Sequence, residues 1–148
     1  MIFEQIADKM ASTPKKLFLI DGLGALLSAF LLGVVLVRLE HVFGIPVKTL
    51  YILAFLPCIF VIYDFYFFLR FKENQKYFLI GIAIMNLIYA FISLGLAFQH
   101  SLEITLFGWT YIIVEVLIII SLVTIELKTA SKLTHVWKSR DAQNRHPK

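Results

Sequence analysis

The chain of 148 residues is short enough to form one domain, and its composition is that of a membrane protein. Hydrophobic residues make up 59% of it, whereas soluble domains contain about 45–50%. Its 14 basic residues outnumber its 10 acidic ones, but they flank long apolar segments, which favours membrane insertion over binding to nucleic acid. The single cysteine, Cys58, excludes an internal disulfide and a cysteine-based metal cluster.

Residues 1–14 predict a short amphipathic helix that lies at the membrane interface. Apolar residues fall on one helical face and charged or amide residues on the other: Ile2, Phe3, Ile6 and Met10 against Glu4, Gln5, Asp8 and Lys9. Pro14 ends this helix, and the two lysines that follow it mark the membrane boundary. The alternative to an interfacial helix is a frayed chain terminus.

Four apolar segments follow, each long enough to cross a bilayer as a helix, which requires about 20 residues. They are residues 17–37, 50–69, 77–98 and 104–127. Because the connections between them are short, we expect consecutive helices to be antiparallel neighbours in an up-down-up-down four-helix bundle. We therefore predict an all-α integral membrane protein with its transmembrane domain at 15–127 and a basic, partly helical tail at 128–148.

The distribution of basic residues predicts the orientation in the membrane. The N-terminal segment, the connection at 70–76 and the tail contain 12 of the 14 Lys and Arg residues. The connections at 38–49 and 99–103 contain only Arg38 and Lys48. The positive-inside rule therefore places the N-terminus and the C-terminus in the cytoplasm, and we expect a plasma or inner membrane with its lipids as partners.

Polar residues in the first span are candidates for packing or for a site, because polar groups are costly inside a bilayer. Asp21 shares a helical face with Ser28, about one turn inside the cytoplasmic boundary. Pairing with Lys15 and Lys16 is the alternative to a functional role for Asp21. A stripe of small residues runs alongside and is a candidate helix-packing or oligomer contact: Gly22, Ala29 and Gly33.

The second and third spans each contribute one polar residue at depth. Asp64 shares a helical face with Pro57. Pro57 leaves a backbone carbonyl without its hydrogen bond and is expected to kink the helix. A kink near a carboxylate can shape a cavity. Asn86 lies close to mid-membrane, with Tyr89 at the border of its face. Hydrogen bonding between helices is the alternative to a functional role for Asn86.

Glu115 lies near the middle of the fourth span, where a carboxylate costs about 2.5–3.5 kcal/mol on insertion scales. Tyr111 shares its face, and so does Glu126, which we expect to be solvated at the membrane boundary. No Lys, Arg or His lies within the four segments to neutralise the carboxylates. Two alternatives follow: Glu115 is protonated and donates to Asn86, Tyr89 or Tyr111, or the acidic set opens to the cytoplasm and accepts a proton, a cation or an amine.

The sequence therefore predicts a small membrane protein with an acidic cavity that binds a proton, a cation or an amphiphilic ligand, with transport as the activity that this site fits. The candidate ligand-binding residues are Glu115, Asp64, Asn86, Asp21, Tyr89 and Tyr111. A transporter of this size is expected to form a homo-oligomer, because alternating access requires two bundles that move against each other.

Two other functions stay open. One is a structural or accessory subunit whose buried polar groups bind a partner membrane protein. The other is a lipid-modifying enzyme with Asp64 and Glu115 as acid and base, which we rank lower because no nucleophile or phosphate clamp accompanies them. The sequence contains no Gly-rich phosphate loop, nucleophile elbow, HExxH or CxxC, and its histidines lie outside the four segments, so we expect neither a metal nor a cofactor.

Overall fold

The computed structural model describes residues 2–69 and 75–144, and within these ranges every regular element is helical. In chain order the elements are α1 (Ile2–Ser12), α2 (Lys15–Phe30), a π-helical segment η1 (Leu31–Leu36), α3 (Glu40–Phe43), α4 (Val47–Leu69), α5 (Gln75–Gln99) and α6 (Leu106–Asn144). Four stretches are long and apolar enough to cross a membrane: Lys15–Leu36, Val47–Leu69, Lys76–Gln99 and Leu106–Leu133. The prediction of an all-helical protein with four such helices is confirmed.

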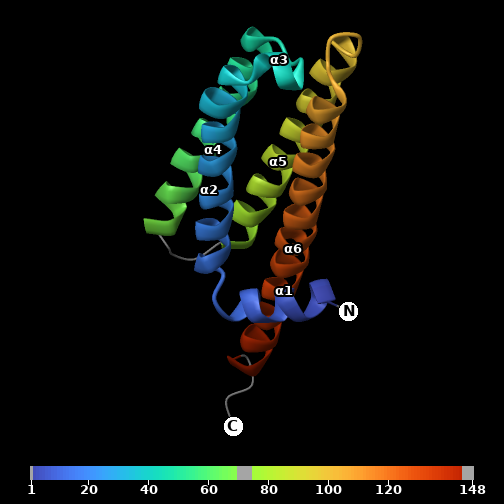
Figure 1. Ribbon diagram of the computed structural model, residues 1–148. Coiled ribbons are helices and arrows are strands. Elements are labelled where there is room, and N and C mark those ends of the chain that lie inside the picture. The colour runs from blue at the N-terminus through green and yellow to red at the C-terminus, as the bar shows by residue number, and fades with distance from the viewer. Residues whose placement is uncertain (1, 70–74, 145–148) are drawn as a thin grey trace.

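The four long helices lie side by side, and α1 runs across one end of them (Figure 1). We call this end the α1 end. Helix α2, continued by η1, packs along α4, and α5 packs along α6. Contacts between α4 and α5 are fewer, and α2 and α6 make fewer still. The bundle therefore consists of two helical hairpins with an open seam between α2 and α6.

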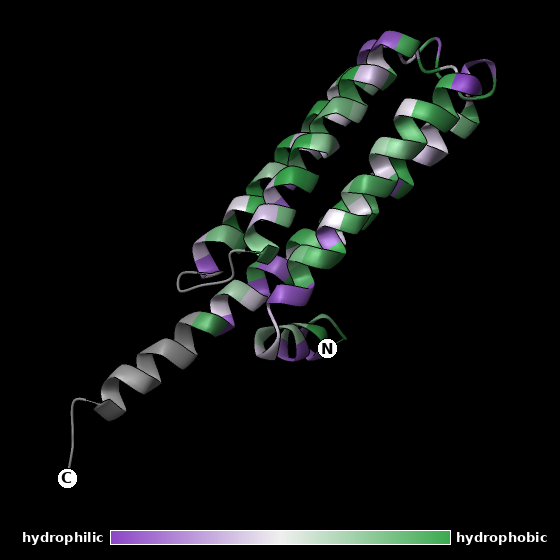
Figure 2. Cartoon of the chain, turned by 90° about the vertical axis from the view of Figure 1, so that its left-hand side faces the viewer, coloured by the Kyte–Doolittle hydropathy of each residue, from purple (hydrophilic) through white to green (hydrophobic). Residues whose placement is uncertain are grey.

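The outside of the bundle is apolar. Large side chains such as those of Ile62 and Phe91 are 71% and 72% exposed. Hydrophobic residues cover the four long helices, while hydrophilic ones gather at their ends and on α1 (Figure 2). In a soluble protein a continuous apolar surface of this size is avoided, so it is the surface expected to contact lipid chains.

Small residues let α2 and η1 approach α4 closely. A Cβ atom added at Gly22 would lie 3.1 Å from the Cβ of Asp64, and one added at Gly33 would lie 3.4 Å from the Cβ of Ala54. The stripe of small residues in the first span is thus placed against α4 of the same chain at both glycines. Its third member, Ala29, is half-buried.

At the end opposite α1, the connection through α3 is joined to the start of α6. The amide N–H of Thr105 donates to the carbonyl of Phe43 (3.1 Å), and its hydroxyl donates to the carbonyl of Val42 (2.6 Å). Gly44 has φ of 67°, in the left-handed region, and a Cβ there would overlap the carbonyl oxygen of Glu103. Glycine at this position therefore permits both the turn and the close approach of the two connections.

At the other end, α1 packs against α6. Lys132 forms an ion pair with Asp8 and donates a hydrogen bond to the carbonyl of Glu4 (3.2 Å). Lys128 lies 4.0 Å from the Glu4 carboxylate. These contacts hold α1 across the side of α6 and cover the neighbouring part of the bundle.

Candidate functional site

A cavity of about 420 Å³ lies at the open seam between α2 and α6. Helices α4 and α5 also contribute to its walls, through Pro57 and Phe60 and through Asn86 and Tyr89 respectively. Helix α4 continues through Pro57, whose ring is buried. The polar side chains that line the cavity are Asp21, Ser28, Asn86, Tyr89, Thr110, Tyr111 and Glu115.

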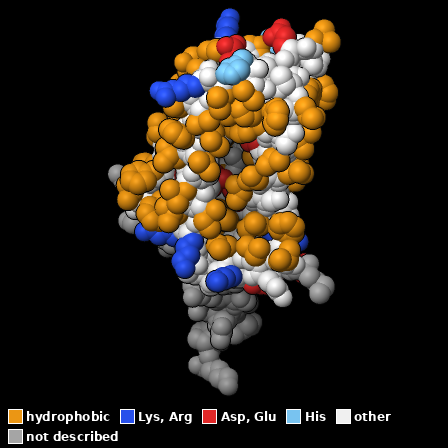
Figure 3. Space-filling view, in the orientation of Figure 1, with side chains coloured by type: hydrophobic (Ala, Val, Ile, Leu, Met, Phe, Trp, Pro, Cys, Tyr) orange, Lys and Arg blue, Asp and Glu red, His pale blue; other side chains and the backbone are white. Residues whose placement is uncertain are grey.

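The mouth of the cavity lies on the side of the bundle. The lining residues Leu27, Val114 and Ile118 are 58%, 49% and 56% exposed and form its rim, whereas Asp21 and Glu115 are buried. In the space-filling view, acidic side chains are visible within a hollow of an otherwise apolar face (Figure 3). The sequence led us to expect an opening at the cytoplasmic end of the bundle. The lining residues instead lead to its side, because α2 and α6 do not close against each other.

Glu115 is held by three hydroxyl groups. Ser28 on α2 (2.5 Å), Tyr89 on α5 (3.0 Å) and Tyr111 on α6 (3.4 Å) all donate to its Oε1 atom. Its other oxygen, Oε2, is buried and has no hydrogen-bond partner among the described residues. The bond from Ser28 crosses the seam, so Glu115 joins the two hairpins where their helices make few other contacts.

Asp21 is held by Asn86. The side-chain amide of Asn86 donates to Oδ1 of Asp21 (2.9 Å), and the carboxyl group of Asp21 also interacts with those of Asp64 and Glu126. This bond also links the two hairpins, because Asp21 belongs to α2 and Asn86 to α5. Both residues line the cavity, so it has a second polar position nearer the α1 end.

Two further carboxyl groups, those of Asp64 and Glu126, lie beside Asp21 and do not line the cavity. Both side chains are almost fully buried, and the carboxyl group of each interacts with that of Asp21. Our expectation that Glu126 is solvated is therefore wrong. The buried side of α6 continues past it through Thr129 and Ala130, towards the part of α6 that α1 covers.

The six candidate ligand-binding residues thus divide into two groups. Glu115, Tyr89 and Tyr111 form one, and Asp21, Asn86 and Asp64 form the other, together with Glu126. The sequence analysis gave Asn86, Tyr89 and Tyr111 as possible partners of Glu115. The two tyrosines contact Glu115, whereas Asn86 binds Asp21. Among the described residues, Glu115 lines this cavity and Asp64 does not.

Ser28 is the site residue that the sequence analysis did not select. Its hydroxyl makes the shortest of the three bonds to Glu115. The signal was present in the sequence, because Ser28 follows Asp21 by two helical turns and lies on the same face. A serine hydroxyl in a helix often bonds to its own backbone, as Ser121 does with the carbonyl of Leu117, so position alone did not distinguish the two serines.

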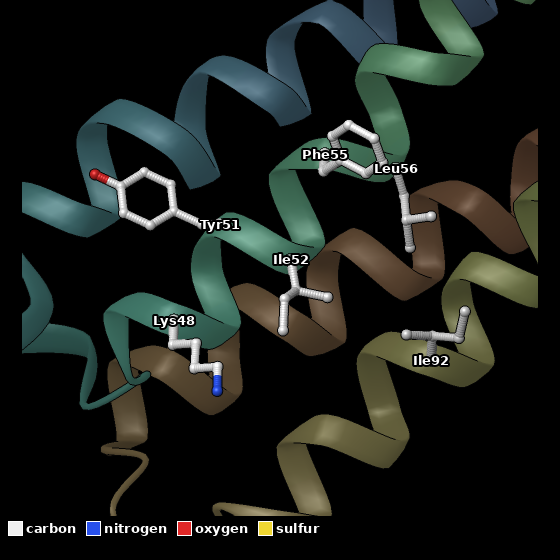
Figure 4. A pocket seen from close by; sticks show the side chains of 6 residues that line it. All are labelled: Lys48, Tyr51, Ile52, Phe55, Leu56 and Ile92. Atoms are coloured by element: carbon white, nitrogen blue, oxygen red, sulfur yellow. The ribbon is translucent and has the colours of Figure 1, made fainter.

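A second hollow, of about 520 Å³, is different in kind (Figure 4). It lies between α4 and α5 and is lined by Lys48, Tyr51, Ile52, Phe55, Leu56 and Ile92. Lys48 is the charged member of this set, and none of the described residues that line the hollow is a buried polar one. Because buried polar groups are what orient and select a ligand, the cavity at the seam is the better candidate site.

The chemistry available in the cavity is that of carboxyl, hydroxyl and amide groups. None of the described residues that line it is Lys, Arg or His. In the described ranges, no group of three or more His, Cys, Asp and Glu side chains is arranged to hold a metal ion. Comparison with family models, with curated proteins and with solved structures finds no match to this chain.

Proposed function

We propose that this protein is a membrane protein that binds an amphiphilic ligand in the cavity between α2 and α6, and that the ligand enters sideways from the bilayer. The observation that carries this proposal is the combination of an apolar rim and a polar interior in one cavity. Leu27, Val114 and Ile118 form the rim, and Glu115 and Asp21 lie inside. A molecule with an apolar chain and a polar headgroup matches both parts.

The size and composition of the cavity support this proposal. Small-molecule sites typically occupy about 300–1,000 Å³ and combine mainly apolar walls with a few convergent polar groups, and the cavity of about 420 Å³ falls in this range. Intramembrane carboxyl groups commonly mark substrate or ion pathways. The alternative ligands expected from the sequence, a proton or an inorganic cation, do not account for the apolar rim.

A photoactivatable alkyl probe in liposomes tests the proposal. An alkyl chain with a diazirine near its end, incorporated with the protein, should label residues of α2 and α6 at the rim more strongly than the rest of the apolar surface. Ala25→Phe should reduce this labelling, because Ala25 lines the cavity and a phenyl ring would fill it. Leu26→Phe is the matched control, since Leu26 is exposed and does not line the cavity.

Uniform labelling of all outward faces, unchanged by Ala25→Phe, would overturn the proposal. If the protein then also formed a stable complex with another membrane protein that protected α2 and α6 from labelling, the accessory-subunit function would be the better description. Protection of α2 and α6 from labelling by a second copy of the same chain would indicate a homo-oligomer.

Orientation and transport extend the proposal. We propose that both termini are cytoplasmic, on the basis of the positive-inside rule, which places the α1 end on the cytoplasmic side. A reporter that is active on only one side of the membrane, fused to the C-terminus, tests this orientation. Transport requires the ligand to leave on the other side of the membrane, and flux of the probe across liposomes tests that step.

A further inference from the structure

The unpaired oxygen atom of Glu115, a residue that lines the cavity, indicates which headgroup the cavity accepts. Each hydroxyl group that lines the cavity already donates within the protein: Ser28, Tyr89 and Tyr111 to Glu115, and Thr110 to the carbonyl of Leu106. All three donors to Glu115 use Oε1, which leaves Oε2 as a buried acceptor. Asp21, by contrast, interacts with Asn86 and with the carboxyl groups of Asp64 and Glu126.

The Oε2 acceptor belongs to a side chain that is nine-tenths buried, with 9% of Glu115 exposed. A buried acceptor without a donor is costly, and a ligand that supplies the donor removes that cost. A ligand with only acceptor groups, such as a carboxylate, would bring further unpaired acceptors into the same space. The cavity is therefore complementary to a headgroup that carries N–H or O–H donors.

The charge of the cavity narrows the choice further. Among the described residues that line it, the titratable ones other than tyrosine are Asp21 and Glu115, and none is basic. Asp64 and Glu126, behind Asp21, add carboxyl groups and no cation. A buried carboxylate is stabilised by a cation that also hydrogen-bonds to it, so a positively charged donor fits better than a neutral one.

The aromatic rings of the cavity also favour a cation. Phe60 and Tyr89 both line it, with ring centroids 6.0 Å apart and nearly perpendicular planes. Tyr111, on the same helix as Glu115, also lines it. Aromatic faces attract ammonium groups, most strongly where water is excluded. The leucine, isoleucine and valine side chains of the rim are suited to an alkyl chain.

We infer that the ligand of this cavity is a protonated alkyl amine whose ammonium group donates to Oε2 of Glu115; this inference rests on the proposed function. Asp21 is a separate polar position, because Ser28, which binds Glu115, lies about 10 Å along α2 from Asp21. Glu115 is the first choice because it lies among the tyrosines and beside the rim residue Val114.

Competition against the photoactivatable probe tests this inference. Four competitors share a twelve-carbon chain and differ in headgroup: dodecylamine, dodecyltrimethylammonium, dodecanol and dodecanoate. Concentrations are expressed as mole fractions in the bilayer, so that different partitioning does not decide the result. Dodecylamine should displace the probe from wild-type protein at about a tenfold lower mole fraction than dodecanol. Dodecyltrimethylammonium, which has the charge but no N–H group, should be weaker than dodecylamine.

Glu115→Gln should abolish the preference for dodecylamine over dodecanol. Glu103→Gln is the matched control, since Glu103 is exposed in the connection before α6, and it should keep the full preference. Equal displacement by the amine and the alcohol would overturn the inference and leave the proposed function standing, and this comparison needs only wild-type protein. Displacement of the probe by dodecylamine and dodecyltrimethylammonium at the same mole fraction would overturn the assignment of a hydrogen bond from the ammonium group to Glu115. Absence of rim labelling would overturn the proposed function itself.

Discussion

Replacement of Gly22 by alanine tests the close approach of α2 to α4, on which the position of Asp21 depends. The new Cβ would lie 3.1 Å from the Cβ of Asp64, shorter than ordinary van der Waals contact. Both Cβ atoms are fixed directly to helical backbones, so neither moves aside by a change of rotamer. The two helices must therefore separate by a few tenths of an ångström.

The magnitude follows from two opposing contributions. Insertion of an extra methyl group into a packed interior costs about 1–3 kcal/mol. Exchange of glycine for alanine within a helix is favourable by about 1 kcal/mol. Gly24→Ala is the matched control, because it makes the same exchange two residues away, where no atom lies within 4 Å of the added Cβ. The helical contribution cancels between the two variants, so Gly22→Ala should be less stable than Gly24→Ala by about 1–3 kcal/mol.

Unfolding of the two variants and of wild type by titration of mixed micelles with dodecyl sulfate, followed by circular dichroism, measures this difference. We expect Gly24→Ala to be at least as stable as wild type, and Gly22→Ala to be less stable than Gly24→Ala. Equal unfolding midpoints for Gly22→Ala and Gly24→Ala would show that α2 and α4 do not approach at Gly22, and would remove the support that α4 gives to that side of the cavity.

Three further substitutions test other contacts. Ser28→Ala removes the hydrogen bond to Glu115 that crosses the seam, and should lower the free energy of unfolding by about 0.6 kcal/mol in the same titration. Ser121→Ala should cost less, because the Ser121 hydroxyl bonds within α6. Equal losses for the two variants would contradict the hydrogen bond between Ser28 and Glu115. Gly44→Ala should lower the yield of folded protein, because the left-handed backbone conformation costs a residue other than glycine about 1–2 kcal/mol, before any steric clash is counted. Gly95→Ala should leave the yield unchanged, because the space around Gly95 is open. Lys132→Ala should change the free energy of unfolding by no more than about 1 kcal/mol, since its ion pair with Asp8 is exposed. The same substitution should speed hydrogen exchange throughout α1. Unchanged exchange would show that contacts other than this ion pair hold α1 against α6.

The membrane helices could be predicted from the sequence because the bilayer imposes a length and a composition on each of them. Helical periodicity also placed Asp21 and Ser28 on one face, and both line the cavity. Glu115 was identified as the costly residue, and three donors converge on it. These features depend on local periodicity and on depth, which a sequence contains.

The pairing of polar groups across helices could not be predicted, because it depends on how each helix is rotated and shifted against its neighbours. Asn86 was expected near Glu115 on the basis of depth, but it binds Asp21. Glu126 was expected in water, but it lies beside Asp21 inside the bundle and is fully buried. The sequence analysis predicted neither the π-helical segment η1, which packs against α4 of its own hairpin, nor the sideways mouth of the cavity.

The division of the bundle into two hairpins has a consequence for biosynthesis. Each hairpin is built from helices adjacent in the chain, whereas the bonds that complete the cavity join residues 65 and 87 positions apart. The N-terminal hairpin leaves the ribosome first, so Asp21 and Ser28 enter the membrane before Asn86 and Glu115 have been synthesised. The nascent chain therefore carries these polar side chains into the lipid without their partners, and the cavity forms only when the second hairpin docks.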